Sequence, residues 1–397
     1  MAGFSHTRVS APIGIAFALL AMANGTASAQ GCEVKLGAMG PLSGGATAWG
    51  IALRAGVELA AAEANQAGGV VVAGKKCNVS VESQDSKYSA EGAAAAANFF
   101  ASKDIVLIIG PVGGPEATGV KPVAQRNGQI TFNSSYAKDA LQTSAPLAFH
   151  QLTGPGVWAK PLVKAAKERF NLKSVVVVAP NDQGGTDVAS ADAAAYKHYG
   201  IATTEEYYQR GTNNFAPIVA RIMRSNPDAV DTASSPPADG ATLVKQLLEA
   251  GFKGVFGRLG GPGTPEIVRA AGGMDALKNF YWLELVAIDD PKVRSMLDDY
   301  KKVMKTAPPD NTLLFTGASA ARMVLKAVTA AGTATDTTKI AAALRALPVT
   351  DPYLGNGAWV GQQAYGINQE LAFPVGMGVI ADGKALGVSV VDVSGKD

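Results

Sequence analysis

Glycines and small polar residues follow the apolar strands that the sequence predicts, and their types suit them to bind an anion. Gly113-Gly114-Pro115 follows the strand expected at 105–109 and opens a helix, with its proline where helix starts favour one. Backbone amides at a helix start carry partial positive charge, so this turn can bind a carboxylate without arginine or lysine. Ser134-Ser135-Tyr136 follows the strand expected at 129–132. We expect these two loops to form a carboxylate-binding site.

Other loops at the carboxyl ends of expected strands carry the same kinds of residue. An open parallel sheet binds its ligands at this edge, so these loops are candidates for one shared site. Trp49 lies in the glycine-rich stretch after the first strand, where it could line a crevice or cap the core. Each serine could equally be a capping or turn residue. The remaining candidates, all beyond residue 180, are Asp182, Gln183, Ser235 in the loop Ser234-Ser235, Gly260 and Glu284.

Residues for catalysis or metal binding do not come together in the sequence. Beyond residue 29 the chain holds two histidines, His150 and His198, and two cysteines, too scattered for a zinc site or a Cys–His pair. Residues 69–75 match most of a phosphate-binding loop, but Lys76 stands where magnesium needs a serine or threonine. That stretch also runs from helix to strand, so we expect a hairpin-like connection. We expect no enzyme activity, no cofactor and no metal centre.

Alternating strands and helices must position these loops. Four strand–helix units precede a break near 150, and a second run of similar size extends to about 285. Three helices follow without strands of their own, so we expect them to return to the first half. A β-rich tail includes one strand expected over 371–380. The pattern predicts an α/β fold of two doubly wound lobes joined by three crossovers, the first lobe formed by 30–149 and 286–351 and the second by 150–285 and 352–397.

The N-terminal segment of the chain indicates that the protein is exported. Residues 1–29 have a short basic start, an apolar core and Ala27-Ser28-Ala29 as a cleavage site, which is the pattern of a signal peptide. We therefore expect a periplasmic protein. Cys32 and Cys77 begin the first two predicted strands of the exported chain, and neighbouring strands lie about 5 Å apart, within reach of a disulfide. An even number of cysteines in an exported protein favours that bond.

Composition excludes two other classes of protein. Charged residues make up 17% of the chain and the formal net charge is +2, with no basic arm, so we expect no nucleic-acid partner. The hydrophobic fraction of 47% is that of a globular chain and not of a disordered one.

Four stretches of the sequence carry a family resemblance: KLGAMGPLSGGATAWG, DIVLIIGPVGGPEATGVKPVAQ, SVVVVAPNDQGG and PDAVDTASSPPADGATLVKQLLEAGFKG. With them, the mature chain resembles the type I periplasmic solute-binding proteins of ABC importers, in particular the leucine/isoleucine/valine-binding branch. The resemblance implies two lobes that close around a ligand and an inner-membrane permease as partner. In that branch the loops corresponding to Gly113-Gly114 and Ser134-Ser135-Tyr136 hold the ligand's carboxylate, and Trp49 lines the side-chain pocket.

The second lobe departs from that branch where the ligand's amine is held. The resemblance places the amine-binding tyrosine at Gly184 and the amine-binding acid at Gly260. A glycine can meet an ammonium only through its carbonyl, and an unpaired buried charge is costly. Either Asp182 or Glu284 binds the amine from a new direction, or the ligand has no α-ammonium. We expect a binding protein for an amino acid or a related organic or aromatic acid; the alternatives are an exported hydrolase or amidase, for which Ser135 has no nearby histidine, and a chemosensory receptor on the same fold.

Overall fold

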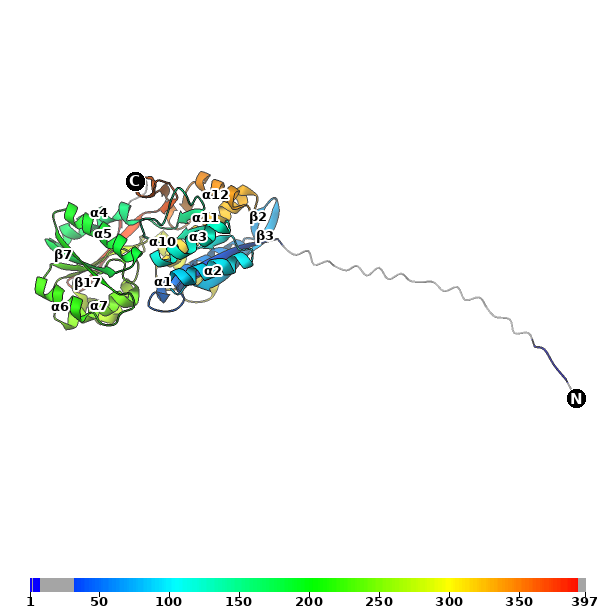
Figure 1. Ribbon diagram of the computed structural model, residues 1–397, viewed down its shortest axis with the longest axis horizontal. Coiled ribbons are helices and arrows are strands. Elements are labelled where there is room, and N and C mark those ends of the chain that lie inside the picture. The colour runs from blue at the N-terminus through cyan, green and yellow to red at the C-terminus, as the bar shows by residue number, and fades with distance from the viewer. Residues whose placement is uncertain (2, 8–31, 392–397) are drawn as a thin grey trace. The chain divides into compact units, whose positions relative to one another are not determined.

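The computed structural model describes residues 1, 3–7 and 32–391. The predicted signal peptide at 1–29 therefore lies outside the described residues, except for its first few positions. From Cys32 onward the chain forms one compact unit. Two large sheets organise that unit, and helices pack on both faces of each sheet (Figure 1). The predicted α/β fold with two doubly wound halves is confirmed.

The first sheet has the strand order β14-β15-β6-β5-β4-β1-β3-β2. Strands from β15 to β3 run parallel, and the edge strands β14 and β2 pair antiparallel with their neighbours. The strands are β1 (Glu33–Gly40), β2 (Val70–Val72), β3 (Lys75–Asp85), β4 (Leu107–Ile109), β5 (Ile130–Asn133), β6 (Ala148–His150), β14 (Ala358–Val360) and β15 (Glu370–Ala372).

Helices cover both faces of this first sheet because its strands are apolar on both sides. Successive side chains of a strand point to opposite faces. Leu36 and Ala38 of β1 join the core that includes α1 and α11, whereas Met39 joins the core that includes α2 and α3. We call this sheet and its helices the first lobe; the helices are α1 (Thr47–Gln66), α2 (Ala90–Ser102), α3 (Gly114–Arg126), α10 (Pro291–Met304), α11 (Leu313–Ala331) and α12 (Thr337–Ala346).

The second sheet has the order β17-β16-β11-β10-β9-β7-β8 and is parallel from β11 to β8. Val177 of β7 packs in the core that includes α4 and α5, and Val178 packs with α6 and α7. We call this sheet and its helices the second lobe. Its elements are α4 (Pro155–Phe170), β7 (Ser174–Pro180), α5 (Gln183–His198), β8 (Ala202–Tyr208), α6 (Ala216–Ser225), β9 (Ala229–Asp231), α7 (Pro237–Glu249), β10 (Val255–Arg258), α8 (Thr264–Ala271), α9 (Met274–Leu277), β11 (Phe280–Glu284), β16 (Val375–Ala381) and β17 (Lys384–Val391).

The chain passes between the two lobes three times, and the last passage differs from the expected one. The first two follow β6 and β11, near the expected positions 150 and 285. After α12 come a small hairpin of β12 (Thr350–Asp351) and β13 (Gly355–Asn356), then β14, α13 (Gln362–Tyr365) and β15. Because β14 and β15 pair within the first sheet, the chain changes lobes between Ala372 and Val375 and not near 352.

The single strand expected over 371–380 is wrong for the same reason. It is two strands, β15 in the first sheet and β16 in the second. Pro374 lies between them and has no amide hydrogen to donate to a sheet, so a continuous ladder cannot run through it.

Local predictions at the start of the chain are largely confirmed. A disulfide joins Cys32 and Cys77. The stretch at 69–75 is a hairpin, because β2 pairs antiparallel with β3. Thr47 is the first residue of α1, and its hydroxyl donates to the Gly44 carbonyl at 2.5 Å.

Helix α11 is the one helix among the described residues that is long and apolar enough to cross a membrane. In this fold it packs against α1, and most of it is buried. The contact is close because Gly56 of α1 has no side chain: a Cβ there would lie 2.2 Å from the Leu314 carbonyl oxygen.

Candidate functional site

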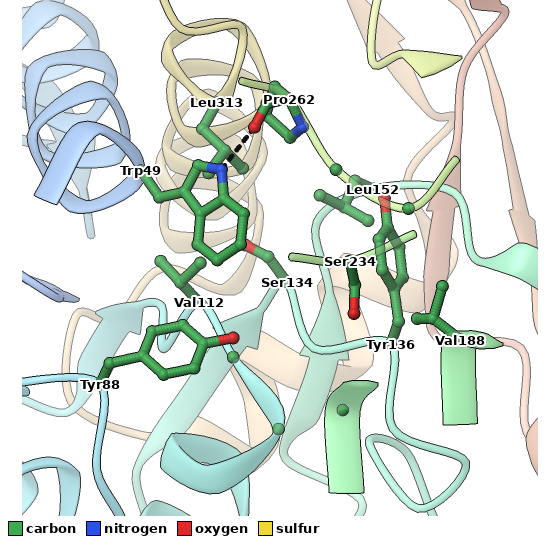
Figure 2. A pocket seen from close by; sticks show the side chains of 15 residues that line it. Trp49, Tyr88, Val112, Ser134, Tyr136, Leu152, Val188, Ser234, Pro262 and Leu313 are labelled. Atoms are coloured by element: carbon green, nitrogen blue, oxygen red, sulfur yellow. Dashed lines mark hydrogen bonds between the residues drawn. The ribbon is translucent and has the colours of Figure 1, made fainter. Parts of the chain in front are cut away.

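A pocket of about 410 Å³, a volume that includes space open to solvent, is lined by loops and helix starts from both lobes. Most of the lining residues follow the carboxyl ends of parallel strands, where the topology predicts ligand binding. Figure 2 shows the residues around it, which are Trp49, Tyr88, Val112, Gly113, Gly114, Ser134, Tyr136, Leu152, Gly184, Val188, Ser234, Gly260, Gly261, Pro262 and Leu313.

Aromatic side chains form one wall of the cavity. Trp49 lies in the first turn of α1, and its indole Nε1 donates to the carbonyl oxygen of Pro262 in the second lobe at 2.6 Å (Figure 2). Tyr88 follows β3, and its ring centroid lies 5.8 Å from that of Trp49. Gly113 makes room for Tyr88, because a Cβ on Gly113 would lie 2.2 Å from the tyrosine hydroxyl. Trp49 thus both lines the cavity and bonds the two lobes together.

Hydroxyl groups face the cavity from both lobes. In the first lobe, Ser134 Oγ accepts a hydrogen bond from Gln151 Nε2, which leaves the serine hydrogen available. In the second lobe, Ser234 is 8% exposed and its Oγ has no hydrogen-bond partner among the described residues. The buried Tyr136 hydroxyl has no hydrogen-bond partner among the described residues either. Burial raises the pKa of Tyr136 far above its usual value, so this phenol stays protonated.

Two helix N-termini border the cavity, one from each lobe. Helix α3 begins at Gly114, and the Gly113 amide donates to the Glu116 carboxylate at 2.5 Å. Helix α5 begins after Asp182, whose carboxylate accepts from the Gly185 amide at 3.0 Å. The first-turn amides of Gly114 and Gly184 have no acceptor inside their own helices, and both residues line the cavity. Two positive helix ends therefore act on the same space.

Gly114 and Gly184 also bring the backbones of the two lobes into contact. A Cβ built on Gly114 would lie 2.6 Å from the Gly184 nitrogen and 2.8 Å from its Cα. Next to this contact, Thr118 Oγ1 donates to Gln183 Oε1 at 2.9 Å, and Gln183 Nε2 donates to Asp139 Oδ1 at 2.6 Å. The lobes are closed on each other in this structure.

Carboxyl groups near the cavity are occupied by other partners. Glu284 Oε1 accepts from Thr312 Oγ1 at 2.5 Å and Oε2 from Trp282 Nε1 at 3.1 Å, and burial raises the Glu284 pKa. Asp182 pairs with Arg210 at 2.5 Å and caps α5.

Glu116, whose carboxylate caps α3, also titrates unusually. Burial raises its pKa to about 7, although hydrogen bonds from the Ser86 hydroxyl and the Gly113 amide stabilise the ionised form. This acid lies at the base of the glycine turn and does not line the cavity itself.

The histidine nearest to this region has a structural environment. His150 is fully buried at the end of β6, and its Nδ1 lies 2.9 Å from Glu370 Oε2. Glu370 Oε1 in turn accepts from the Gly154 amide at 2.9 Å. This pair joins two of the segments that connect the lobes, and neither residue lines the cavity.

The residues that the sequence singled out fall into two groups. Six of them line the cavity together: Trp49, Gly113, Gly114, Ser134, Tyr136 and Gly260. Five lie outside it: Ser135, Asp182, Gln183, Ser235 and Glu284. Ser135 Oγ accepts from the Ala137 amide at 3.2 Å, and the Ser235 hydroxyl lies 3.5 Å from the Val178 carbonyl oxygen. Which of these residues contact a ligand stays a prediction.

Tyr88 and Pro262 are lining residues that the sequence did not single out. Tyr88 follows a strand as Trp49 does, so the same rule applied to β3 would have found it. Of the predicted loop Ser234-Ser235, Ser234 is the member that lines the cavity, and Ala233 just before it has a left-handed backbone with φ of 39°. Pro262 contributes through its carbonyl oxygen, for which the sequence carries no signal.

Comparisons with known proteins agree with this architecture. The sequence model of the family described as periplasmic binding protein matches residues 33–370. A leucine-, isoleucine-, valine-, threonine- and alanine-binding protein of Pseudomonas aeruginosa is 25% identical over 334 residues, which cover 83% of this chain and 87% of the relative.

Two solved structures share the fold. A branched-chain amino acid transporter substrate-binding protein of Streptococcus pneumoniae, in complex with isoleucine, has a TM-score of 0.76 at 20% identity and covers 90% of this chain and 99% of its own. A solute-binding protein of an ABC transporter from R. palustris, in complex with benzoate, has a TM-score of 0.73 at 19% identity. The match covers 91% of this chain and 98% of that protein's chain.

Proposed function

The chain belongs to the periplasmic binding protein family, of the branched-chain amino acid ABC transporter type, and from this premise we propose that it captures a small carboxylate-bearing solute between its lobes. The observation that carries the proposal is the meeting of two helix N-termini, at Gly114 and Gly184, on one cavity that both lobes line. Partial positive charge and free first-turn amides are the features with which a protein binds an anion without a cationic side chain.

Closure of the two lobes distinguishes the solute-bound protein from the empty one. Trp49 and Gln183 bond across the lobes next to the cavity. A solute that contacts both lobes stabilises the closed form selectively. We propose that an inner-membrane permease distinguishes this closed form from the open one, and that the chain acts in the periplasm after its signal peptide is removed.

An enzyme on the same fold finds little support in these contacts. Ser134 bonds to Gln151, and His150 is buried against Glu370 outside the cavity. No serine or cysteine among residues 32–391 is hydrogen-bonded to a histidine, so a nucleophile–base pair is not assembled. We therefore propose a binding role without catalysis.

Calorimetric unfolding with a panel of small carboxylic acids and amino acids tests the proposal. A ligand at about 100 times its Kd stabilises the folded protein by about 2.7 kcal/mol, which is readily measured. Ligand-free protein, prepared by unfolding, dialysis and refolding, should be stabilised by at least one small acid. Stabilisation by none of them would refute the proposed site. Mass spectrometry of the solute recovered after binding separates the roles, because an enzyme would return a changed molecule.

A further inference from the structure

The walls of the cavity carry no formal charge. Among the described residues, the lining set contains no aspartate, glutamate, lysine, arginine or histidine. Its polar groups include the hydroxyls of serines and tyrosines, the Trp49 indole bonded to the Pro262 carbonyl, and the backbone amides of glycines, among them Gly114 and Gly184 at the starts of two helices. Negative charge is favoured at helix N-termini and positive charge is disfavoured. The field in this space therefore suits an anion and opposes an ammonium group.

A second observation supports an acceptor-bearing ligand independently of the helices. Ser234 is more than nine-tenths buried, lines the cavity, and its Oγ has no partner within the described part of the chain. Buried hydroxyls are normally hydrogen-bonded, because an unsatisfied one has lost its water without compensation. Figure 2 shows this hydroxyl beside the cavity, with Ser134 on the side of the first lobe. A carboxylate has enough lone pairs to accept from both serines and both glycine amides.

The carboxylates that could bind an amine are engaged elsewhere. Glu284 has one oxygen bonded to Thr312 and the other to Trp282. Asp182 has one oxygen on the Gly185 amide and the other on Arg210. Neither lines the cavity.

Asp192 is the buried acid, among the described residues, whose two carboxylate oxygens both lack a hydrogen-bond partner, and it needs separate treatment. It lies one turn beyond Val188 on α5, fully buried, and Val188 lines the cavity while Asp192 does not. Burial, with a smaller effect of the nearby Asp231 carboxylate, raises its pKa well above the usual value. The raised pKa favours the neutral form of the Asp192 carboxyl, and that form offers an ammonium no negative charge. Asp192→Asn is therefore the variant that tests this carboxyl if the protein binds an amine.

The remaining walls describe the rest of the ligand. Trp49, Tyr88 and Tyr136 contribute aromatic surface, and Val112, Leu152, Val188 and Leu313 contribute aliphatic surface (Figure 2). A compact apolar body fits these walls, and a ring can pack against the aromatic side chains. On the basis of the proposed function, we infer that the solute is an apolar monocarboxylic acid, preferably aromatic, that carries no ammonium group.

Pairs of ligands that differ only in the ammonium test this inference. Isothermal titration of the ligand-free protein is carried out with 3-phenylpropanoate and L-phenylalanine, and with 4-methylpentanoate and L-leucine. We expect the plain acid of a pair to bind at least about 100-fold more tightly than the amino acid, and 3-phenylpropanamide, which lacks the carboxylate, not to bind. Equal or tighter binding of the amino acids would overturn this inference and leave the proposed function standing. Binding of none of these compounds would overturn both.

Variants that introduce a negative charge into the cavity give a second test of ligand selectivity. Ser234→Asp should weaken 3-phenylpropanoate at least about 10-fold and introduce measurable binding of L-phenylalanine, whereas Ser234→Ala should weaken the acid without gaining the amino acid. Thermal unfolding of each variant checks that it folds, and the wild-type comparison stands if one does not. If the wild-type protein binds amino acids and Asp192→Asn removes that binding, Asp192 is the amine partner and the inference is wrong.

Discussion

Replacing Gly114 by alanine should prevent the two lobes from closing fully while each lobe stays folded. The added Cβ would lie 2.6 Å from the nitrogen and 2.8 Å from the Cα of Gly184, and both atoms are backbone that cannot rotate away. Gly114 is the first residue of α3 and has no left-handed backbone, so alanine fits the helix itself. The strain therefore falls on the closed state and leaves the open one unaffected.

The size of the effect follows from what overpacked contacts cost. Overpacking by a methyl group destabilises a packed interface by about 1–3 kcal/mol. Because every 1.4 kcal/mol is about a tenfold change in an equilibrium constant, ligand affinity should fall about 5- to 150-fold. In the absence of ligand, the midpoint of thermal unfolding should stay the same or rise slightly, since Gly→Ala reduces the entropy of the unfolded chain.

Gly184→Ala is the matched control on the other side of this contact. Its Cβ would lie 3.2 Å from the Gly114 nitrogen and 3.4 Å from the Gly114 Cα, which small shifts can relieve. We expect it to change affinity much less than Gly114→Ala does. Titration calorimetry with 3-phenylpropanoate measures affinity, and small-angle scattering with and without the acid measures closure. If Gly114→Ala binds and closes as the wild-type protein does, the lobes do not meet at these glycines in the bound state.

Three further predictions concern closure, pH and the disulfide. Trp49→Phe keeps an aromatic wall but removes the donor to the Pro262 carbonyl, so ligand affinity should fall about 3- to 10-fold in titration calorimetry while the unliganded stability changes little. Burial raises the pKa of Glu116 from 4.5 to about 7, so the folded state binds this proton more tightly than the unfolded state does. The free energy of unfolding should therefore fall by up to about 3 kcal/mol as pH rises between these two values. Urea unfolding measures this pH dependence, and Glu116→Gln should flatten it. Breaking the bond between Cys32 and Cys77, 45 residues apart, by a double serine variant should lower stability by about 4 kcal/mol in the chain-entropy model without changing ligand affinity; an unchanged urea midpoint would contradict this.

Strands and helices with clear local signals were predictable from the sequence. The strand expected at 129–132 is β5, and Gly128 just before it marks its start. Helix α2 begins where Ser89 could cap it, and the serine side chain does accept from the Gly92 amide. These signals act over a few residues, so a pattern search finds them.

The tail shows where local signals end. The apolar run from 371 to 380 looks like one strand, yet its two halves pair in different sheets. Membership of a sheet depends on partners far away in sequence: β15 pairs with β6, and β16 with β11. Pro374 was the one local clue, because a proline inside a strand weakens the case for a continuous ladder.

The candidate site was also predictable only where local signals and strand order decide the outcome. Loops after parallel strands were predictable as the place of the cavity, because the topology rule needs only strand order. Which member of a loop reaches the cavity was not, since this depends on how the two lobes meet. Gln183 and Asp182 belong to the right loop, but one bonds across the lobes to Thr118 and Asp139, and the other pairs with Arg210.

Selectivity and closure are connected through the same glycines. Gly184 is the position to which the family resemblance assigns an amine-binding tyrosine, and its backbone contacts Gly114 of the other lobe. Gly260, to which the resemblance assigns the amine-binding acid, has a left-handed backbone with φ of 104°, and a Cβ there would lie 2.6 Å from Val188 Cγ1. A side chain at Gly260 would therefore be obstructed by Val188, whereas at Gly184 a Cβ meets Gly114 only at 3.2–3.4 Å and a longer side chain would extend into the approach of the two lobes. The proposed absence of an amine-binding group and the close approach of the lobes thus depend on the same glycines, so the closure experiment on Gly114 and the ligand-pair titrations examine one structural arrangement.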